Sequence, residues 1–357
     1  MTRLAGRREV FFVEEPIYHE GRPEFEIQPV APGLRVIKSR LGVTGPAFGA
    51  AQQRALMTGF RDILARNGWS EFVAWLYTPM AIRVARSLAP RRIIYDCVAS
   101  LTAPRSADSA ELERELLAHA DVVITESQSL LKAKEHPRCV LCLPSSIDEK
   151  HFARAKRSKD APDQVSLPTP RLGYIGVVDD RLDFEILDTV ASQRPEWQIV
   201  LVGPVAASSP ASLPHRPNLH YLGPRPYAEL PRYIAGWDAC LMPFLTNHGG
   251  GVDSARVLEY LAADRPVVGT PVPDLAEAYA EIAYLGEGAA GFLDACGRAL
   301  DSSATERRAR RTMAKRALAR TSWDETAASM DQILTGLLGR AAKLFSPTLP
   351  ASQGAIA

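Results

Sequence analysis

The chain has 357 residues, a length that suits two domains of ordinary size, and its 46% of hydrophobic residues can fill two cores. Lys and Arg number 42 against 41 Asp and Glu, so the formal net charge of +1 gives no support to nucleic-acid binding. No stretch approaches the roughly 20 apolar residues of a membrane-spanning helix, and the amino terminus lacks an apolar signal-peptide core. We therefore expect a cytoplasmic protein.

The first half of the chain alternates short apolar runs with helical patterns. Strands are predicted at 10–13, 34–37, 72–76, 93–95, 122–125 and 140–143, and helices at 50–65, 80–88, 110–120 and 130–136. Such alternation predicts a parallel sheet with helices on both faces. We assign residues 1–155 to this Rossmann-like domain and the charged, proline-containing residues 156–170 to a linker.

A second α/β series follows the linker. Strands are predicted at 172–175, 199–202, 219–222, 239–242, 267–270 and 282–285, and helices at 183–192, 227–235, 254–263 and 289–300. The fold class is therefore α/β, with two doubly wound domains, the second spanning residues 171–305. Two such domains in tandem form a cleft, and ligands bind at the carboxyl ends of the strands.

The last part of the sequence, residues 306–340, is helical and begins with a basic segment. Residues 306–320 carry six arginines and one lysine, and residues 323–338 form an amphipathic pattern expected to pack back on the first domain. Two interpretations of the basic segment stay open, a solvated helix face and peripheral contact with an anionic membrane surface or lipid phosphate. Residues 341–357 are expected to be a disordered tail.

The five cysteines are odd in number, and most lie in or beside apolar runs. Cys139 and Cys142 have the CxxC spacing, but the pair lies in a strand-like run with no second ligand pair downstream. We expect reduced cysteines that pack in the core.

Residues 241–274 contain the densest cluster of candidate ligand-binding groups. A buried strand is followed by three glycines, Gly249 to Gly251, and then by a helix that carries Arg256 and Glu259. The glycines allow a ligand close to the backbone, the first helical turn offers N–H groups to an anion, and Glu259 can accept two hydroxyl hydrogen bonds. Phosphate and diol together suggest a nucleotide, although an ordinary helix after a flexible loop fits this segment equally well.

An ordered series of motifs resembles the group 1 (family 4-like) glycosyltransferases of the GT-B fold. The second half carries Gly-Tyr-Ile-Gly at 173–176 and Leu-Glu-Tyr-Leu at 258–261, within the similar segments 170–183, 197–204, 218–224, 233–244 and 258–268. The first half agrees at 75–80, 94–97, 120–125 and 144–148. The resemblance implies two Rossmann-like domains facing a cleft, with a nucleotide-diphosphate sugar held mainly by the second.

The resemblance also implies roles for individual residues. Glu259 matches the glutamate that holds the ribose hydroxyls, and Arg256 stands near the diphosphate. Gly173 and Gly176 match the first turn of the donor domain. Arg181 is a candidate to neutralise the departing diphosphate, with a surface residue beside acidic neighbours as the alternative.

The sequence departs from the family at the donor sugar. Gly251 occupies the position at which many relatives have a sugar-contacting glutamate. We expect that contact to come from the loop backbone at Gly250 and Gly251, to come from Asn247, His248 or Asp253, or to be weak.

Two further departures affect the acceptor side. The chain opens on what resembles the end of the first helix, so the first domain is expected to lack its first strand. Asp96 remains at a strand end, where it can position an acceptor hydroxyl or bond a local loop or helix end.

The predicted function is transfer of a sugar from a nucleotide-diphosphate sugar to a saccharide or lipid-linked hydroxyl acceptor, in cell-surface polysaccharide or glycoconjugate assembly. Retention is usual in the family, no cofactor is implied, and no Asp-x-Asp pair indicates a metal. Alternatives are a catalytically impaired scaffold or partner, a GT-B epimerase and a sugar phosphorylase. A nicotinamide dehydrogenase fits least, because no strand is followed by G-x-G-x-x-G.

Overall fold

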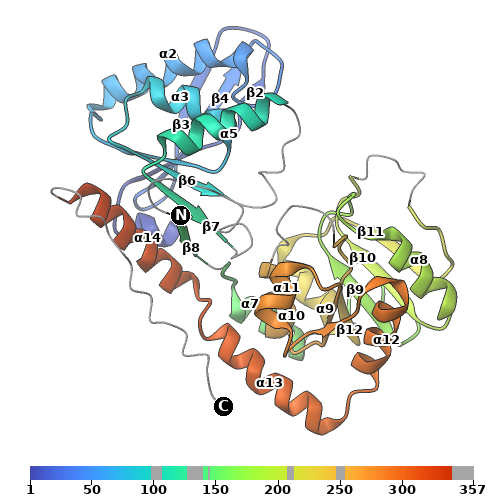
Figure 1. Cartoon of the computed structure of the whole chain (residues 1–357). Helices are drawn as coiled ribbons and strands as arrows, with labels where there is room; N and C mark the ends of the chain where they lie inside the picture. Colours follow the sequence, from blue (N-terminus) through green and yellow to red (C-terminus); the bar gives the residue numbers. More distant parts are fainter. Residues whose placement is uncertain (98–106, 127–139, 144, 207–212, 247–253, 340–357) are drawn as a thin grey trace. The chain divides into compact units, whose positions relative to one another are not determined.

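The computed structural model describes residues 1–97, 107–126, 140–143, 145–206, 213–246 and 254–339. The described residues divide into two compact units (Figure 1), the first formed by residues 1–72 and 324–339 and the second by the described residues between 73 and 323. The helix expected at 130–136 and the tail expected at 341–357 lie outside the described residues. No helix in the described parts is long and apolar enough to cross a membrane.

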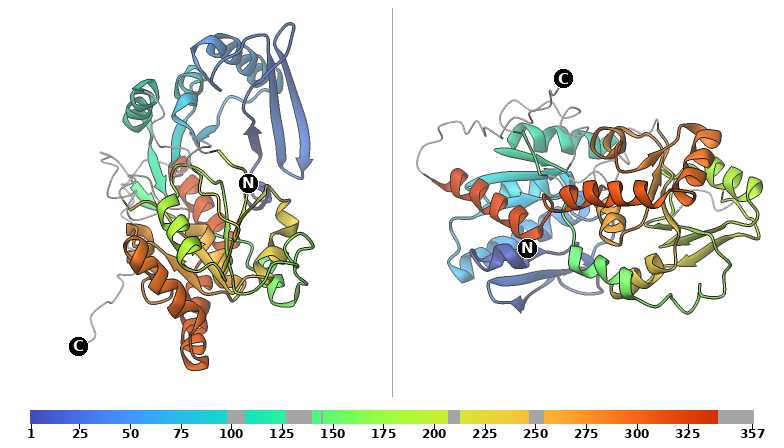
Figure 2. Two further views of the ribbon diagram at one scale, coloured as in Figure 1. Left: turned by 90° about the vertical axis from the view of Figure 1, so that its right-hand side faces the viewer. Right: turned by 90° about the horizontal axis from the view of Figure 1, so that it is seen from below.

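The first unit contains a mixed four-stranded sheet. Strand β4 lies between β1 and β2, with which it is parallel, and also pairs in antiparallel register with β3. The paired β3 and β4 are the long blue strands of Figure 2. The elements are α1 (Thr2–Ala5), β1 (Val10–Val13), β2 (Ile17–Tyr18), β3 (Glu24–Ala31), β4 (Leu34–Leu41), α2 (Ala50–Asn67) and α14 (Trp323–Leu338).

The hairpin of β3 and β4 corrects the prediction of an entirely parallel sheet. Pro32 and Gly33 connect the two strands. Gly33 has φ of 73°, and a tight turn with proline followed by glycine requires a positive φ at the glycine. Strand β3 was missed because it alternates Glu24 and Glu26 with half-buried residues, and only one of its faces is covered.

Helices α2 and α14 complete the first unit. Gly59 of α2 lies so close to the Phe25 ring that a Cβ there would be 2.1 Å from it, which brings the helix directly onto β3. Helix α14 is joined to the amino-terminal residues by ion pairs of Arg3 with Asp324 at 2.6 Å and of Arg8 with Asp331 at 2.5 Å.

The second unit begins with a parallel four-stranded sheet in sequential order. Its strands confirm four predicted positions, and β6 and β7 are buried along almost their whole length, which explains their continuous apolar sequence. The strands predicted for one amino-terminal sheet therefore belong to two sheets. The elements are β5 (Val73–Leu76), η1 (Pro79–Ala81), α3 (Ile82–Ser87), β6 (Arg92–Cys97), α5 (Ala107–His119), β7 (Val122–Thr125) and β8 (Val140–Cys142).

The second sheet of this unit has six parallel strands in the order β11-β10-β9-β12-β13-β14. This is the 3-2-1-4-5-6 order of the Rossmann fold. Helix α8 packs beside α12, and α10 packs against α7 and α13, so helices cover both faces (Figure 1). The strands are β9 (Arg171–Ile175), β10 (Gln198–Val202), β11 (Leu219–Gly223), β12 (Ala239–Met242), β13 (Val267–Gly269) and β14 (Tyr284–Leu285). The helices are α7 (Glu149–Ala153), η2 (Arg154–Arg157), α8 (Phe184–Gln193), η4 (Tyr227–Glu229), α9 (Leu230–Ala235), α10 (Ser254–Ala262), α11 (Pro273–Tyr279), α12 (Gly288–Leu300) and α13 (Ala304–Leu318).

The segment 156–170 packs against this second sheet and its helices. Gln164 is fully buried, accepts a hydrogen bond from Nε1 of Trp237 at 3.0 Å and donates one to the Tyr233 carbonyl at 2.8 Å. Asp160 forms an ion pair with the buried Arg171. Despite their linker-like composition, these residues contribute to the core.

Two local predictions are also resolved. Helix α11 was missed because Pro271 and Pro273 suggest a turn, whereas Pro273 occupies the first turn of the helix, where its missing N–H has no cost. Among the described residues four cysteines are free, and three of them are buried, as expected of core thiols.

Candidate functional site

The strand order identifies where a ligand can approach the six-stranded sheet. The order reverses between β9 and β12, because successive strands are added to one side of β9 and then to the other. In sheets of this order, ligands bind at the carboxyl edge beside the point where the strand order reverses. Residues 176–183 follow β9, and residues 243–246 follow β12.

The backbone of these loops is held by hydrogen bonds across the edge. The Asp183 N–H donates to the Pro243 carbonyl at 2.8 Å, and the Leu245 N–H donates to the Arg181 carbonyl at 2.9 Å. The Phe244 N–H donates to Oγ1 of Thr270 at 3.1 Å. These contacts fix the two loops relative to each other, which is what a preorganised binding site needs.

The glycines at the end of β9 are required by close packing. Gly176 has φ of 154°, and Gly203, at the end of β10, has φ of 151°. A Cβ on Gly203 would lie 1.8 Å from the Gly176 carbonyl oxygen, so these strand ends touch through their backbones. A Cβ on Gly173 would lie 1.9 Å from the Trp237 ring, so core packing alone explains its missing side chain. Donor binding by Gly173 and Gly176 stays a prediction.

Helix α10 places Arg256 and Glu259 one turn apart near this edge. Glu259 is only 7% exposed, and its Oε2 lies 2.5 Å from Nη1 of Arg256. The helix is tied to the end of β9, because the Ile175 N–H donates to Oη of Tyr260 at 2.8 Å. The structure thus brings together the two residues that the sequence assigned to the nucleotide, as an ion pair in which the carboxylate is buried and the guanidinium is partly exposed.

Arg181 lies in the loop after β9, with its side chain one third exposed. Its Nε donates to both carboxylate oxygens of Asp179, at 3.0 and 3.1 Å, and its Nη2 lies 2.9 Å from Oδ2. The arginine therefore lies at the predicted edge, and an acidic neighbour holds it there.

Sequence reasoning missed Tyr227 and His151 near the same helix. The Tyr227 ring stacks on the His151 ring with centroids 4.3 Å apart and planes at 10°, and His151 Nε2 lies 2.9 Å from the Tyr227 carbonyl oxygen. Burial raises the pKa of Tyr227, the charges of Glu259 and Asp148 raise it further, and Arg256 lowers it. Tyr227 is thus electrostatically close to the ion pair, yet 53% exposed, and it offers a flat apolar surface to a ligand.

Asp96 lies at the carboxyl end of β6, in the four-stranded sheet of the same unit. It is 8% exposed, and its Oδ2 accepts a hydrogen bond from Nε1 of Trp75 at 3.0 Å. Burial raises the pKa of Asp96 to about 6, although the Trp75 hydrogen bond acts in the opposite direction. The carboxyl group can therefore change charge near neutral pH.

The remaining candidates, Asn247, His248, Gly250 and Gly251, lie outside the described residues, as does Asp253. In the parts of the chain that the structure describes, no group of three or more His, Cys, Asp or Glu side chains could hold a metal ion.

Comparisons with known proteins find glycosyltransferases among the proteins that this chain resembles. Residues 184–335 match the family described as "Glycosyl transferase-like". The protein TuaH of Bacillus subtilis (strain 168), named as a teichuronic acid biosynthesis glycosyltransferase, is 28% identical over 60% of this chain. The match spans 60% of the length of that relative.

Solved structures are similar over nearly the whole chain. Sucrose-phosphate synthase from Thermosynechococcus elongatus has a TM-score of 0.70 at 20% identity and covers 94% of this chain and 91% of its own. A trehalose-6-phosphate structure from E. coli, bound with UDP-2-fluoro glucose, has a TM-score of 0.69 at 12% identity, with 93% and 94% covered. Identities this low establish the fold alone, and they confirm the predicted GT-B class.

Proposed function

We propose that this chain, a GT-B protein related to the group 1 glycosyltransferases, transfers a sugar from a nucleotide-diphosphate sugar to an acceptor hydroxyl. The observation that carries the proposal is Glu259, a buried carboxylate beside Arg256 near the carboxyl edge of a Rossmann-ordered sheet. Burying a carboxylate is costly unless it is paired, and a fixed acceptor near the carboxyl edge of the sheet suits a vicinal diol.

The donor site follows from the residues around Glu259. Its two carboxylate oxygens accept the ribose hydroxyls, and Tyr227 offers its exposed ring to the base. Arg256 and Arg181 carry the positive charge that the diphosphate requires. Because both arginines already pair with carboxylates, they must exchange part of that contact for phosphate oxygens when the donor binds.

The reaction forms one bond and breaks another. The acceptor oxygen attacks the anomeric carbon, the bond from that carbon to the diphosphate oxygen breaks, and the diphosphate leaves with the electron pair. The acceptor proton passes to a base, which is the departing phosphate oxygen if the reaction retains configuration. We assign Asp96 to hold the acceptor hydroxyl, and the arginines to stabilise the leaving charge.

The wider role in our proposal is polysaccharide assembly, supported by the name of the Bacillus subtilis relative. The same proposal includes retention of configuration at the anomeric carbon and a reaction that needs no metal ion. It also includes a cytoplasmic location, with peripheral membrane contact through α13. The acceptor class is a saccharide or a lipid-linked saccharide.

Release of nucleoside diphosphate from a panel of uridine and guanosine diphosphate sugars tests the proposal. We start with UDP-glucose, because a fold relative binds its fluoro analogue. Release should be lost in Glu259→Gln and kept in Glu196→Gln, an exposed glutamate in the turn before β10. If every sugar nucleotide in the panel is left intact, with and without saccharide acceptors, the enzyme proposal is wrong.

One observation favours a second candidate, a scaffold that binds nucleotide sugars without turning them over. The two predicted diphosphate ligands, Arg181 and Arg256, both lie in ion pairs with neighbouring carboxylates, at 2.9 and 2.5 Å. Nucleoside diphosphate binding without hydrolysis or transfer, for all donors, would support this candidate over the enzyme.

A further inference from the structure

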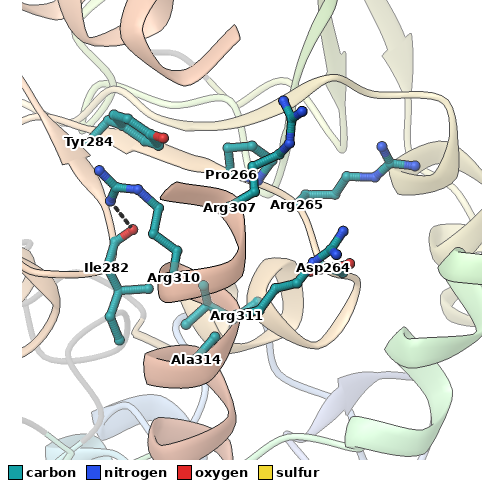
Figure 3. A pocket seen from close by; sticks show the side chains of 10 residues that line it. Asp264, Arg265, Pro266, Ile282, Tyr284, Arg307, Arg310, Arg311 and Ala314 are labelled. Atoms are coloured by element: carbon teal, nitrogen blue, oxygen red, sulfur yellow. Dashed lines mark hydrogen bonds and ion pairs between the residues drawn. The ribbon is translucent and has the colours of Figure 1, made fainter. Parts of the chain in front are cut away.

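A pocket of about 50 Å³ lies at the edge of the six-stranded sheet opposite to the proposed donor site (Figure 3). It is lined by residues 264–266, which precede β13, by the start of β14 and by α13. Its volume is several times the roughly 10–15 Å³ that one water molecule needs. The pocket therefore has room for one small polar group, and it shares no residue with the donor site.

Positive charge dominates this pocket. Four arginines line it, namely Arg265, Arg307, Arg310 and Arg311, and Asp264 is the carboxylate among the lining residues. Asp264 lies 2.8 Å from Nε of Arg311, and the other three arginines donate to backbone carbonyl oxygens of Ala235, Ser302 and Ile282. These bonds hold the guanidinium groups in place, and among the four arginines only Arg311 forms an ion pair with a carboxylate in the described parts of the chain.

Glu306 reduces this charge only in part. Its carboxylate caps α13 through the Ser303 N–H at 2.8 Å. The hydrogen bonds with Ser303 lower its pKa most, and Arg310 and Arg307 add a smaller effect. Four cations against two carboxylates leave a positive excess around the pocket.

Two buried donors beside the pocket have no hydrogen-bond partner among the described residues. They are Oη of Tyr284, a residue only 4% exposed, and Nε of Arg265. Figure 3 shows the Tyr284 hydroxyl directed towards Pro266, another residue that lines the pocket. Arg310 stacks on the Tyr284 ring at 3.6 Å from its centroid, which holds the ring in this orientation. Buried polar groups are normally satisfied, so the Tyr284 hydroxyl indicates a missing acceptor.

We propose that this pocket is a second anion site, which binds one phosphate group through arginines of α13, with Tyr284 as a neutral donor. Arginine suits phosphate because its planar fork donates two parallel hydrogen bonds. The phosphate can be free or can belong to a lipid headgroup, and both sources present the same oxygen acceptors. The site is independent of the proposed transferase activity.

Titration calorimetry of the full chain with inorganic phosphate tests the proposal. Arg307→Gln should weaken phosphate binding about tenfold or more, as expected for loss of one charge-assisted hydrogen bond. The control Arg308→Gln removes the same charge from the next residue of α13, which is exposed and does not line the pocket. Tyr284→Phe should also weaken binding, while leaving the melting temperature without phosphate unchanged or higher, because it removes an unpartnered buried hydroxyl.

Sedimentation with vesicles separates the two sources. Phosphatidylcholine vesicles with and without phosphatidic acid are compared for the same variants. Phosphate binding in solution without sedimentation assigns a free phosphate, and sedimentation lost in Arg307→Gln but kept in Arg308→Gln assigns a headgroup. Equal losses in Arg307→Gln and Arg308→Gln, or no effect of Arg307→Gln and Tyr284→Phe in either assay, overturn the proposal. These measurements need no sugar-nucleotide turnover, so failure of the transferase proposal leaves them unaffected.

Discussion

Replacement of Glu259 by alanine is the most direct perturbation of the proposed donor site. Glu259 is buried, and its carboxylate is shared between Arg256 and, in our proposal, two ribose hydroxyls. Each hydrogen bond to a charged acceptor is worth about 1.5–3 kcal/mol. Loss of both therefore removes about 3 kcal/mol or more, equivalent to roughly a hundredfold weaker affinity.

The change in affinity predicts a change in thermal shift. At a nucleoside diphosphate concentration about 100 times the dissociation constant, binding stabilises the folded wild-type chain by about 2.7 kcal/mol. In Glu259→Ala the same concentration only matches the dissociation constant, and the stabilisation falls to about 0.4 kcal/mol. At about 2–4 °C per kcal/mol, the ligand-induced shift decreases from roughly 5–10 °C to about 1 °C.

Differential scanning fluorimetry with uridine and guanosine diphosphates measures this shift. Each variant is compared with its own ligand-free baseline, because Glu259→Ala also leaves Arg256 without its buried carboxylate. Glu196→Ala, on the exposed turn before β10, controls for loss of one negative charge. A wild-type shift that persists in Glu259→Ala would refute the reasoning, since the nucleotide would then bind elsewhere.

Three further predictions follow from burial and packing. Burial raises the pKa of Asp96 to about 6, above the roughly 4 of an unfolded aspartate, so the folded chain loses stability as pH rises from about 4 to about 6. Melting temperatures across this range should fall more for wild type than for Asp96→Asn, and parallel profiles would contradict the buried environment. Gly173→Ala should destabilise by about 1–3 kcal/mol or more by overpacking, because its Cβ meets the Trp237 ring. Gly297→Ala, within α12, should be neutral or stabilising by up to about 1 kcal/mol, because a Cβ there meets nothing within 4 Å. Gln164→Leu should lower the free energy of unfolding by about 1–3 kcal/mol for each buried partner that it leaves unpaired. Urea unfolding measures this loss, and an unchanged free energy of unfolding would show that residues 156–170 are not part of the core.

The strands of the six-stranded sheet could be predicted because each is buried on both faces. Strand β10 contains the uninterrupted apolar run Ile199–Val202, and helix α10 has a clear amphipathic period, so Arg256 and Glu259 were placed on a helix after a strand. Strand β3 could not be recognised from apolar character, because its glutamates face solvent. Its hairpin partner β4 was predicted as a strand at 34–37, but the pairing with β3 was not recognised.

The position of Tyr227 in the site could not be predicted. It follows a proline-rich turn and begins the helix predicted at 227–235, a pattern that does not say which other elements its ring contacts. Its approach to Glu259 depends on α7, which packs against both α9 and α10 and brings His151 under the Tyr227 ring. Such packing is decided by the tertiary structure and leaves no local pattern in the sequence.

The ion pairs between the amino-terminal residues and α14 also affect synthesis of the chain. Arg8 and Asp331 are separated by 323 positions, whereas residues 73–323 form a unit that is continuous in sequence. On the ribosome the continuous unit can fold as it emerges, but the first unit must wait for α14. The amino-terminal sheet should therefore be the last part to become protected, and the part most exposed to proteases while translation is in progress.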